Sequence, residues 1–389
     1  MSRRSDLVAA LQTVERAVST RQTIPVLGGV LLTAEGGQLR LYATDLELAV
    51  ECAIPAQVEE TGAAVVEARY LHQVVRRLEE GEVIIEKAAD SGVVNVMAPG
   101  SRLSLQYQPA DDFPRLAEVE EGTSFNIRRS TLLSMIRATL FAAATDPGRP
   151  FLTGVLFEVE PEEIRLVATD GNRLAFRRHV WIDGEKPPLA PWKAIVPGRS
   201  LGELMRGAGS IPVPQRDAGD DAGDEEDHEV KVEADRKEIS FTWPNYRLTT
   251  RLIEGQFPNY RPVIPAQQRL SIVVPRDPFL AALERTAVLS RTGTAFTTLT
   301  LENGILRLRS REAEVGEIDE QIPVHYEEAP FETAYQARFL TEALRVLDTE
   351  NVVLGLEASL SPGTIRPQLE PGQSGNDQYV YVMMPIRLG

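Results

Sequence analysis

The feature that most constrains this chain is an internal repeat, because one string of secondary-structure signals is written three times over 389 residues. Each repeat opens with a segment whose apolar residues recur at helical spacing, and a second such segment follows later in the repeat. The first segments cover residues 7–18, 132–143 and 279–289, and the second segments cover residues 69–79, 199–206 and 338–347. The repeat therefore predicts three similar domains with two helices each.

Apolar and polar residues alternate between the two helical segments of each repeat, as they do in strands of a half-buried antiparallel sheet. Turn residues break the alternation at Gly36-Gly37, Pro161-Glu162 and Asn303-Gly304, which predicts a hairpin in every repeat. Further alternating runs follow the second helical segments. We predict an α+β chain in which two helices of each domain pack on antiparallel sheets. The predicted domains cover residues 1–120, 124–265 and 268–389.

Thr44, Thr169 and Ser310 take matching places in the three repeats, and the wider second interval indicates an insertion in the central repeat. The stretch 215–229 accounts for it, because its many acidic residues with Gly and Ala are typical of a solvated, disordered loop. Its acids do not follow the frame of an EF-hand. Each repeat is also expected to leave open sheet edges, and pairing between repeats or closure into a ring would remove them.

The net charge of the chain, taken alone, argues against a nucleic-acid partner. Its formal net charge is −16, whereas phosphate binding usually needs a basic surface. The one cysteine, Cys52, cannot form an internal disulfide and is predicted to be a core residue, so a reducing cytoplasm is expected. No run is long and apolar enough for a membrane span, and the N-terminal segment lacks the continuous apolar stretch of a secretory signal.

The sequence contains none of the motifs that mark phosphate-binding loops, dinucleotide folds or nucleophile elbows. The histidines are scattered without metal-ligand spacing, so neither a metal nor a cofactor is expected. Asp45 and Asp170, in the stretches ATDL and ATDG, could form a two-carboxylate hydrolase site. A simpler interpretation is that each carboxylate caps backbone N–H groups of a turn.

Four segments together resemble the bacterial beta sliding clamp family, the beta subunits of DNA polymerase III. They are RQTIPVLGGVLL (21–32), VATDGNRLA (167–175), EGQFPNYRPVIP (254–265) and YVMMPIRL (381–388). The likeness runs in order over essentially the whole chain, and its C-terminal segment is the most specific part. Ile386, where many members have a second methionine, and the additional Gly389 depart from the family pattern.

The resemblance implies a non-catalytic processivity factor, a head-to-tail homodimeric ring of six similar domains with helices lining the hole. Double-stranded DNA would pass through the ring without sequence preference. The replicative polymerase, clamp-loader subunits, and other polymerases and repair proteins would bind through short peptides. A ring that is acidic outside and basic inside would reconcile the net charge with DNA binding, because arginines gather at the helices.

The resemblance also implies three sets of site residues. The expected DNA contacts are Arg21, Arg77, Arg137, Arg149, Arg199, Arg206 and Arg291. The expected peptide cleft consists of Thr169, Gly171, Asn172, Arg173, Leu174, Ile253, Val382, Met384, Pro385, Ile386, Arg387 and Leu388. The expected dimer contacts place Leu103 and Leu105 of one subunit against Val288 and Leu289 of the other. Two alternatives stay open on the residues alone: a hydrolase that uses Asp45 and Asp170, and a scaffold that binds proteins without DNA.

Overall fold

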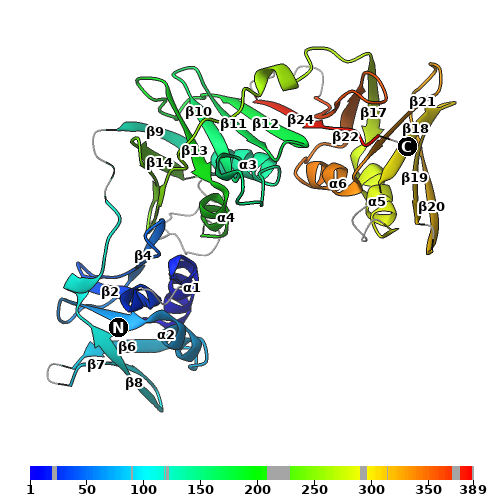
Figure 1. Ribbon diagram of the computed structural model, residues 1–389. Helices are drawn as coiled ribbons and strands as arrows, with labels where there is room; N and C mark the ends of the chain where they lie inside the picture. Colours follow the sequence, from blue (N-terminus) through cyan, green and yellow to red (C-terminus); the bar gives the residue numbers. More distant parts are fainter. Residues whose placement is uncertain are drawn as a thin grey trace, which may run out of the picture. The chain divides into compact units, whose positions relative to one another are not determined.

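A computed structural model (Figure 1) describes the chain at residues 1–19, 24–88, 91–117, 119, 122–207, 228–289, 296–312, 314–369 and 377–387. Most of the predicted acidic insertion, residues 215–227, lies outside these ranges, as do Arg21, Arg291, Leu388 and Gly389. Contacts divide the chain into two compact units. The first holds residues 1–132, 183–190 and 199–252, and the second holds residues 133–182, 191–198 and 253–389.

Two α-helices occur in each repeat, as the sequence predicts. They are α1 (Arg4–Val14), α2 (Ala68–Val75), α3 (Arg129–Leu140), α4 (Gly198–Gly207), α5 (Arg276–Thr286) and α6 (Ala337–Arg345). Short 3-10 helices are η1 (Glu15–Ala17), η2 (Pro25–Gly28), η3 (Ala110–Asp112), η4 (Pro150–Leu152) and η5 (Arg261–Val263). The first helix of every repeat begins earlier than its apolar pattern, because its first turn carries polar residues or proline and so adds nothing to that pattern.

Eight strands belong to each repeat within the described residues. The first repeat has β1 (Ser2–Arg3), β2 (Gly29–Glu35), β3 (Gln38–Thr44), β4 (Leu48–Pro55), β5 (Gly62–Glu67), β6 (Glu82–Lys87), β7 (Val93–Ala98) and β8 (Ser101–Gln108). The second has β9 (Thr123–Arg128), β10 (Gly154–Val159), β11 (Glu163–Thr169), β12 (Arg173–Val180), β13 (Trp192–Pro197), β14 (Glu229–Ala234), β15 (Glu238–Trp243) and β16 (Tyr246–Arg251). The third has β17 (Leu270–Pro275), β18 (Thr297–Glu302), β19 (Ile305–Glu312), β20 (Gly316–Pro323), β21 (Phe331–Tyr335), β22 (Asn351–Leu356), β23 (Gly363–Pro367) and β24 (Asp377–Met383).

The strand order repeats as well. One four-stranded order recurs as β5-β2-β3-β4, β13-β10-β11-β12 and β21-β18-β19-β20, and a second recurs as β1-β6-β7-β8, β9-β14-β15-β16 and β17-β22-β23-β24. Neighbouring strands pair antiparallel throughout. The fold class predicted from the repeat is therefore confirmed.

Neighbouring repeats share sheets. Strand β4 of the first repeat pairs with β16 of the second, and β12 of the second pairs with β24 of the third. The central repeat consequently gives one of its sheets to each unit, which is why contacts divide the chain through its middle rather than at the repeat boundaries. Cys52 lies in β4 opposite Tyr246 and is fully buried.

The three predicted hairpins form at the expected turns. Gly36 and Gly37 have φ of 57° and 76°, and Asn303 and Gly304 have φ of 50° and 76°, left-handed values that favour these residue types. The paired residues that follow the turns are Gln38, Glu163 and Ile305. Counting from them, the counterpart of Thr44 and Thr169 is Arg311. The sequence alignment with Ser310 was thus wrong by one residue, because the third repeat lacks a Thr-Asp pair to mark the place.

Helices of one repeat pack side by side where both belong to one unit. Helix α1 contacts α2, and α5 contacts α6 (Figure 1). In the second unit, strands β10, β11, β12 and β24 present a buried apolar face that includes Leu156, Val167, Phe176 and Val380, and Tyr260 packs on it. No helix in the described ranges has the length and apolar character needed to cross a membrane.

Candidate functional site

The turn between β11 and β12 is built by the side chains of Thr169 and Asp170. The Thr169 hydroxyl donates to the Arg173 carbonyl at 2.6 Å and accepts the N–H of Gly171 at 3.1 Å. The Asp170 carboxylate accepts the N–H groups of Asn172 and Arg173 at 2.9 and 3.1 Å. This confirms the turn interpretation of the Thr-Asp pair.

The first repeat contains the same turn between β3 and β4. The Thr44 hydroxyl donates to the Leu48 carbonyl and accepts the N–H of Leu46. The Asp45 carboxylate accepts the N–H groups of Glu47 and Leu48 at 3.0 and 2.9 Å. Leu46 stands where the second repeat has Gly171, and both adopt positive φ, 75° and 94°. Each aspartate therefore stabilises its turn by accepting two backbone N–H groups.

Arg173 joins this turn to the third repeat. Its side chain is 5% exposed, Nε lies 3.0 Å from Asp170, and the guanidinium pairs with Glu342 of α6 and donates to the Phe141 carbonyl at 2.7 Å. It also lies over the ring of Phe339, 4.6 Å from the centroid. Burial lowers the pKa of Arg173, but its hydrogen bond to Glu342 and nearby charges outweigh this, so its pKa is raised and it stays charged.

A cleft of about 270 Å³ opens beside this turn. Its apolar lining includes Leu152, Leu174 and Val382, together with Met384, which is 43% exposed. The Met384 N–H donates to the Asn172 carbonyl at 2.9 Å, so the C-terminal segment is anchored to the β11–β12 turn. Aliphatic side chains with an adaptable methionine suit the side chains of a peptide.

The structure brings most of the predicted cleft residues together. Those that line it are Thr169, Gly171, Asn172, Arg173, Leu174, Val382 and Met384. Ile253 is not among the lining residues, but it packs against an apolar cluster that includes the lining residues Leu174 and Val382, and it bridges to Ile195. Pro385, Ile386 and Arg387 follow Met384 but are not among the lining residues, and the Ile386 N–H donates to the Ala334 carbonyl at 2.7 Å.

Sequence reasoning missed several lining residues: Phe151, Leu152, Pro258, Asn259, Tyr260 and Val263. Four of them lie in the segment EGQFPNYRPVIP, whose likeness to the family was noted while its side chains were not assigned to the cleft. Arg149, predicted as a DNA contact, also lines the cleft, and its guanidinium donates to the Asp170 carbonyl at 3.0 Å.

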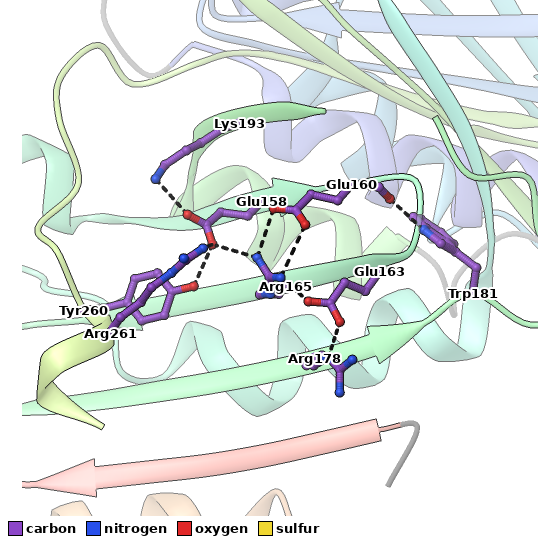
Figure 2. A network of polar contacts seen from close by, with 9 residues as sticks. All are labelled: Glu158, Glu160, Glu163, Arg165, Arg178, Trp181, Lys193, Tyr260 and Arg261. Atoms are coloured by element: carbon purple, nitrogen blue, oxygen red, sulfur yellow. Dashed lines mark hydrogen bonds and ion pairs between the residues drawn. The ribbon is translucent and has the colours of Figure 1, made fainter. Parts of the chain in front are cut away.

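Tyr260 is held by a polar network on the same sheet (Figure 2). Its hydroxyl donates to Glu158 at 2.6 Å, and Lys193 donates to the other oxygen of that carboxylate at 2.7 Å. Burial raises the pKa of Glu158, but the hydrogen bonds from Lys193 and Tyr260 outweigh it and leave the pKa lowered. Burial and the hydrogen bond to Glu158 raise the pKa of Tyr260 to about 12. The ring of Tyr260 is thereby fixed at the edge of the cleft.

The other predicted DNA contacts that the structure describes lie at exposed positions on helices or just after one. Arg77 follows α2, Arg137 lies on α3, and Arg199 and Arg206 lie on α4. Arg199 pairs with Asp45 at 2.5 Å and Arg206 pairs with Glu203. Both arginines are exposed, at 56% and 51%, whereas their acid partners are nearly buried, so part of each guanidinium faces solvent.

The predicted dimer contacts are accessible in their own units. Leu103 and Leu105 are half-buried on β8, which pairs with β5 only at Tyr107 and Gln108 and so leaves an edge open over residues 101–106 in the described part of the chain. Val288 is 56% exposed just after α5, and Leu289 next to it is half-buried.

Three family profiles cover the chain in succession. They describe the N-terminal, central and C-terminal domains of the DNA polymerase III beta subunit and match residues 1–117, 126–259 and 261–387. The chain belongs to the DNA polymerase III beta subunit family. The resemblance read from the four sequence segments is confirmed.

Curated relatives carry the name beta sliding clamp. Those of Synechococcus elongatus and Pseudomonas aeruginosa are each 33% identical to this chain, and both alignments cover 99% of this chain and 98% of the relative. The beta sliding clamp of Escherichia coli is 31% identical with the same coverage.

Solved sliding clamps share the fold over their full length. A Pseudomonas aeruginosa clamp bound to griselimycin superposes with a TM-score of 0.87 at 32% identity, covering 99% of this chain and 98% of that one. The Bacillus subtilis clamp gives a TM-score of 0.86 at 26% identity, covering 100% and 98%. As a member of this family, the chain is a processivity subunit for the replicative polymerase and is itself non-catalytic. The hydrolase alternative is therefore set aside.

Proposed function

We propose that two copies of this beta sliding clamp close head to tail around duplex DNA and tether the replicative polymerase through the cleft beside Met384. One observation carries the proposal. Of the three places where the repeat allows sheets of successive domains to pair, two are filled within the chain, by β4 with β16 and by β12 with β24. The third would join β20 to β8, and both strands keep an open edge in the described residues.

The register of this third pairing follows from the other two. Ala49 and Leu174, which pair with Thr44 and Thr169, lie opposite Thr249 and Val382. Their counterpart in the third repeat is Glu317, which pairs with Arg311. Ser104 is the counterpart of Thr249, since the pairs Asn95–Ser104 and Ser240–Thr249 hold the same place after their turns.

The chemistry of the resulting contacts is favourable. Glu317 of one subunit would lie opposite Ser104 of the other, Ile318 opposite Leu103, and Asp319 opposite Arg102. The last pair repeats an arrangement inside the chain, where Glu51 lies opposite Arg247. A chain that supplies one edge of each kind forms a heterologous contact, and two such contacts close a dimer by two-fold rotation.

Exposed arginines on the helices support DNA as the threaded ligand. Arg77, Arg137, Arg199 and Arg206 are proposed to contact phosphates, with Arg21 and Arg291 retained as predictions. Such contacts carry no sequence information and weaken with salt, which permits sliding. Arg149 remains a predicted DNA contact, and its position against Asp170 supports an additional place at the cleft rim.

The cleft is proposed to bind short peptides of the polymerase catalytic subunit, of clamp-loader subunits, and of other polymerases and repair proteins. Its apolar surface and fixed turn support this role. A pocket that combines aliphatic side chains with a flexible methionine can adapt to the different apolar side chains of several partner peptides.

Retention on DNA tests encirclement directly. The clamp is loaded by its clamp loader onto a nicked circle, and half of the sample is linearised before gel filtration. We expect the protein to stay with the circles and to slide off the linear molecules. Equal retention on both would rule out encirclement, and a protein that stays with neither the circles nor the linear molecules would instead favour the scaffold alternative.

A further inference from the structure

A second hollow of about 410 Å³ lies on the same face of the second unit's sheet as the peptide cleft. Tyr260 lines both. Phe176 and Val380 line the hollow, whereas Leu174 and Val382, two residues along the same strands, line the cleft. Residues two apart on a strand share a face and are separated by about 7 Å, so the two depressions are immediate neighbours.

Positive charge distinguishes this hollow from the chain as a whole, whose formal net charge is −16. Arg165, Arg261 and Arg366 line it together with Gln378, and no acidic side chain is among its lining residues in the described part of the chain. An excess of one charge at a concave apolar surface concentrates ligands of the opposite charge.

The acids nearby are already occupied (Figure 2). Glu160 and Glu163 pair with Arg165, and Glu163 also pairs with Arg178. Glu158 accepts from Lys193 and Tyr260, while Arg261 approaches it only to 3.7 Å and keeps a side chain that is 65% exposed. The charge of Arg261 is therefore available to a ligand.

Arg366 has unused hydrogen-bonding capacity. One terminal nitrogen donates to the Pro265 carbonyl at 3.3 Å, and Nε is buried without a hydrogen-bond partner among the described residues. Arg366 nevertheless lines the hollow, and a charge-assisted hydrogen bond from a guanidinium to a carboxylate is stronger than one between neutral groups.

We propose that this hollow is an acidic-residue subsite that continues the peptide cleft past Tyr260. A partner peptide would place its apolar anchor in the cleft and an aspartate or glutamate from its flanking sequence beside Arg261 and Arg366. The proposal rests on the proposed peptide binding in the cleft and adds to it a rule for selecting partners. Among peptides with the same apolar anchor, those with an acidic residue in the flanking sequence would bind with higher affinity.

Fluorescence anisotropy with the full-length clamp tests the subsite. Three labelled peptides share one anchor of adjacent leucine and phenylalanine, with asparagine and glutamine flanks in the first, and acidic residues on the N-terminal or C-terminal flank in the others. We expect one acidic peptide to bind about five- to tenfold more tightly than the neutral one, with a preference that falls as salt rises. Arg261→Gln and Arg366→Gln should each reduce that preference and leave the affinity for the neutral peptide unchanged.

Arg40→Gln serves as the matched control, because Arg40 is exposed and carries only loose pairs with Glu35 and Glu51 at 3.7 and 3.5 Å. It should keep the full preference for the acidic peptide. The subsite is refuted if the wild type binds neutral and acidic peptides alike, or if its preference survives both arginine substitutions. Absence of binding by all three peptides would instead overturn the peptide cleft itself, so the two failures are distinguishable.

Discussion

At the scale of single residues, Tyr260 is a side chain that the peptide cleft and the arginine-lined hollow share. It separates the cleft from the arginine-lined hollow, and its ring lies 5.9 Å from that of Phe176. A hydrogen bond to Glu158 of β10 orients it, although Tyr260 itself lies just before η5 and not on a strand. A residue that no catalytic motif or periodicity singles out thus organises two neighbouring sites.

Glu158 makes this arrangement dependent on pH. Its folded-state pKa is lowered, so its contribution to stability is present above the unfolded pKa of about 4.3 and is lost as pH falls through the folded value. We expect Glu158→Gln to lower the free energy of unfolding by about 2 kcal/mol at neutral pH, because hydrogen bonds to a charged acceptor are weakened.

Urea denaturation across acidic pH measures the difference in the free energy of unfolding between wild type and Glu158→Gln. The difference between them should shrink as the pH falls below about 4.3, where the Glu158 carboxyl of the unfolded chain becomes protonated, and should vanish below the lower folded-state pKa. A difference that stays constant down to the lowest pH would show that Glu158 acts through packing alone.

At the scale of elements, the strand edges carry the most specific prediction. If β8 of one subunit pairs with β20 of the other in the register derived above, Ser104 and Glu317 lie directly opposite, at the Cα separation of about 5 Å that a disulfide accepts. Ser104→Cys with Glu317→Cys should therefore form an intersubunit disulfide in high yield under mild oxidation, read on a non-reducing gel.

Ser104→Cys with Ile318→Cys provides the out-of-register control, since successive side chains of a strand point to opposite faces. Burial raises the pKa of the Cys52 thiol, which therefore stays protonated and out of the reaction. Equal crosslinking of both pairs, or preferential crosslinking of the control, would refute the register.

At the scale of the whole molecule, ring closure and peptide binding are expected to be separable. The open edges belong to β8 and β20, whereas the cleft is completed by the segment after β24. Deleting residues 384–389 should abolish peptide binding and leave the dimer intact. Leu103→Asp should have the opposite effect, because it places a charge against Ile318 of the other subunit.

Light scattering and peptide anisotropy, performed on both variants, distinguish the two properties. A truncated chain that still binds peptide with wild-type affinity would contradict the assigned cleft. A Leu103→Asp variant that stays dimeric at micromolar concentration would contradict the assigned interface.

Much of this protein follows from its sequence alone. The threefold repeat determined the number of helices per domain, the hairpin turns and the α+β class, because periodicity and turn chemistry are local properties. The four family-like segments led to the correct family. The Thr-Asp turns were also predictable, since the side chains that build them are sequence neighbours.

Only the tertiary structure decided which distant residues meet. In the third repeat, the counterpart of Thr44 and Thr169 is Arg311 and not the predicted Ser310. The cleft lining includes Tyr260 and Pro258 but not Ile253. The structure also showed Arg173 joining Asp170 to Glu342, and Glu158 holding Tyr260. Such contacts depend on which strands of different repeats pair and on packing between repeats, and periodicity within a segment indicates the buried face of a strand but not its partner.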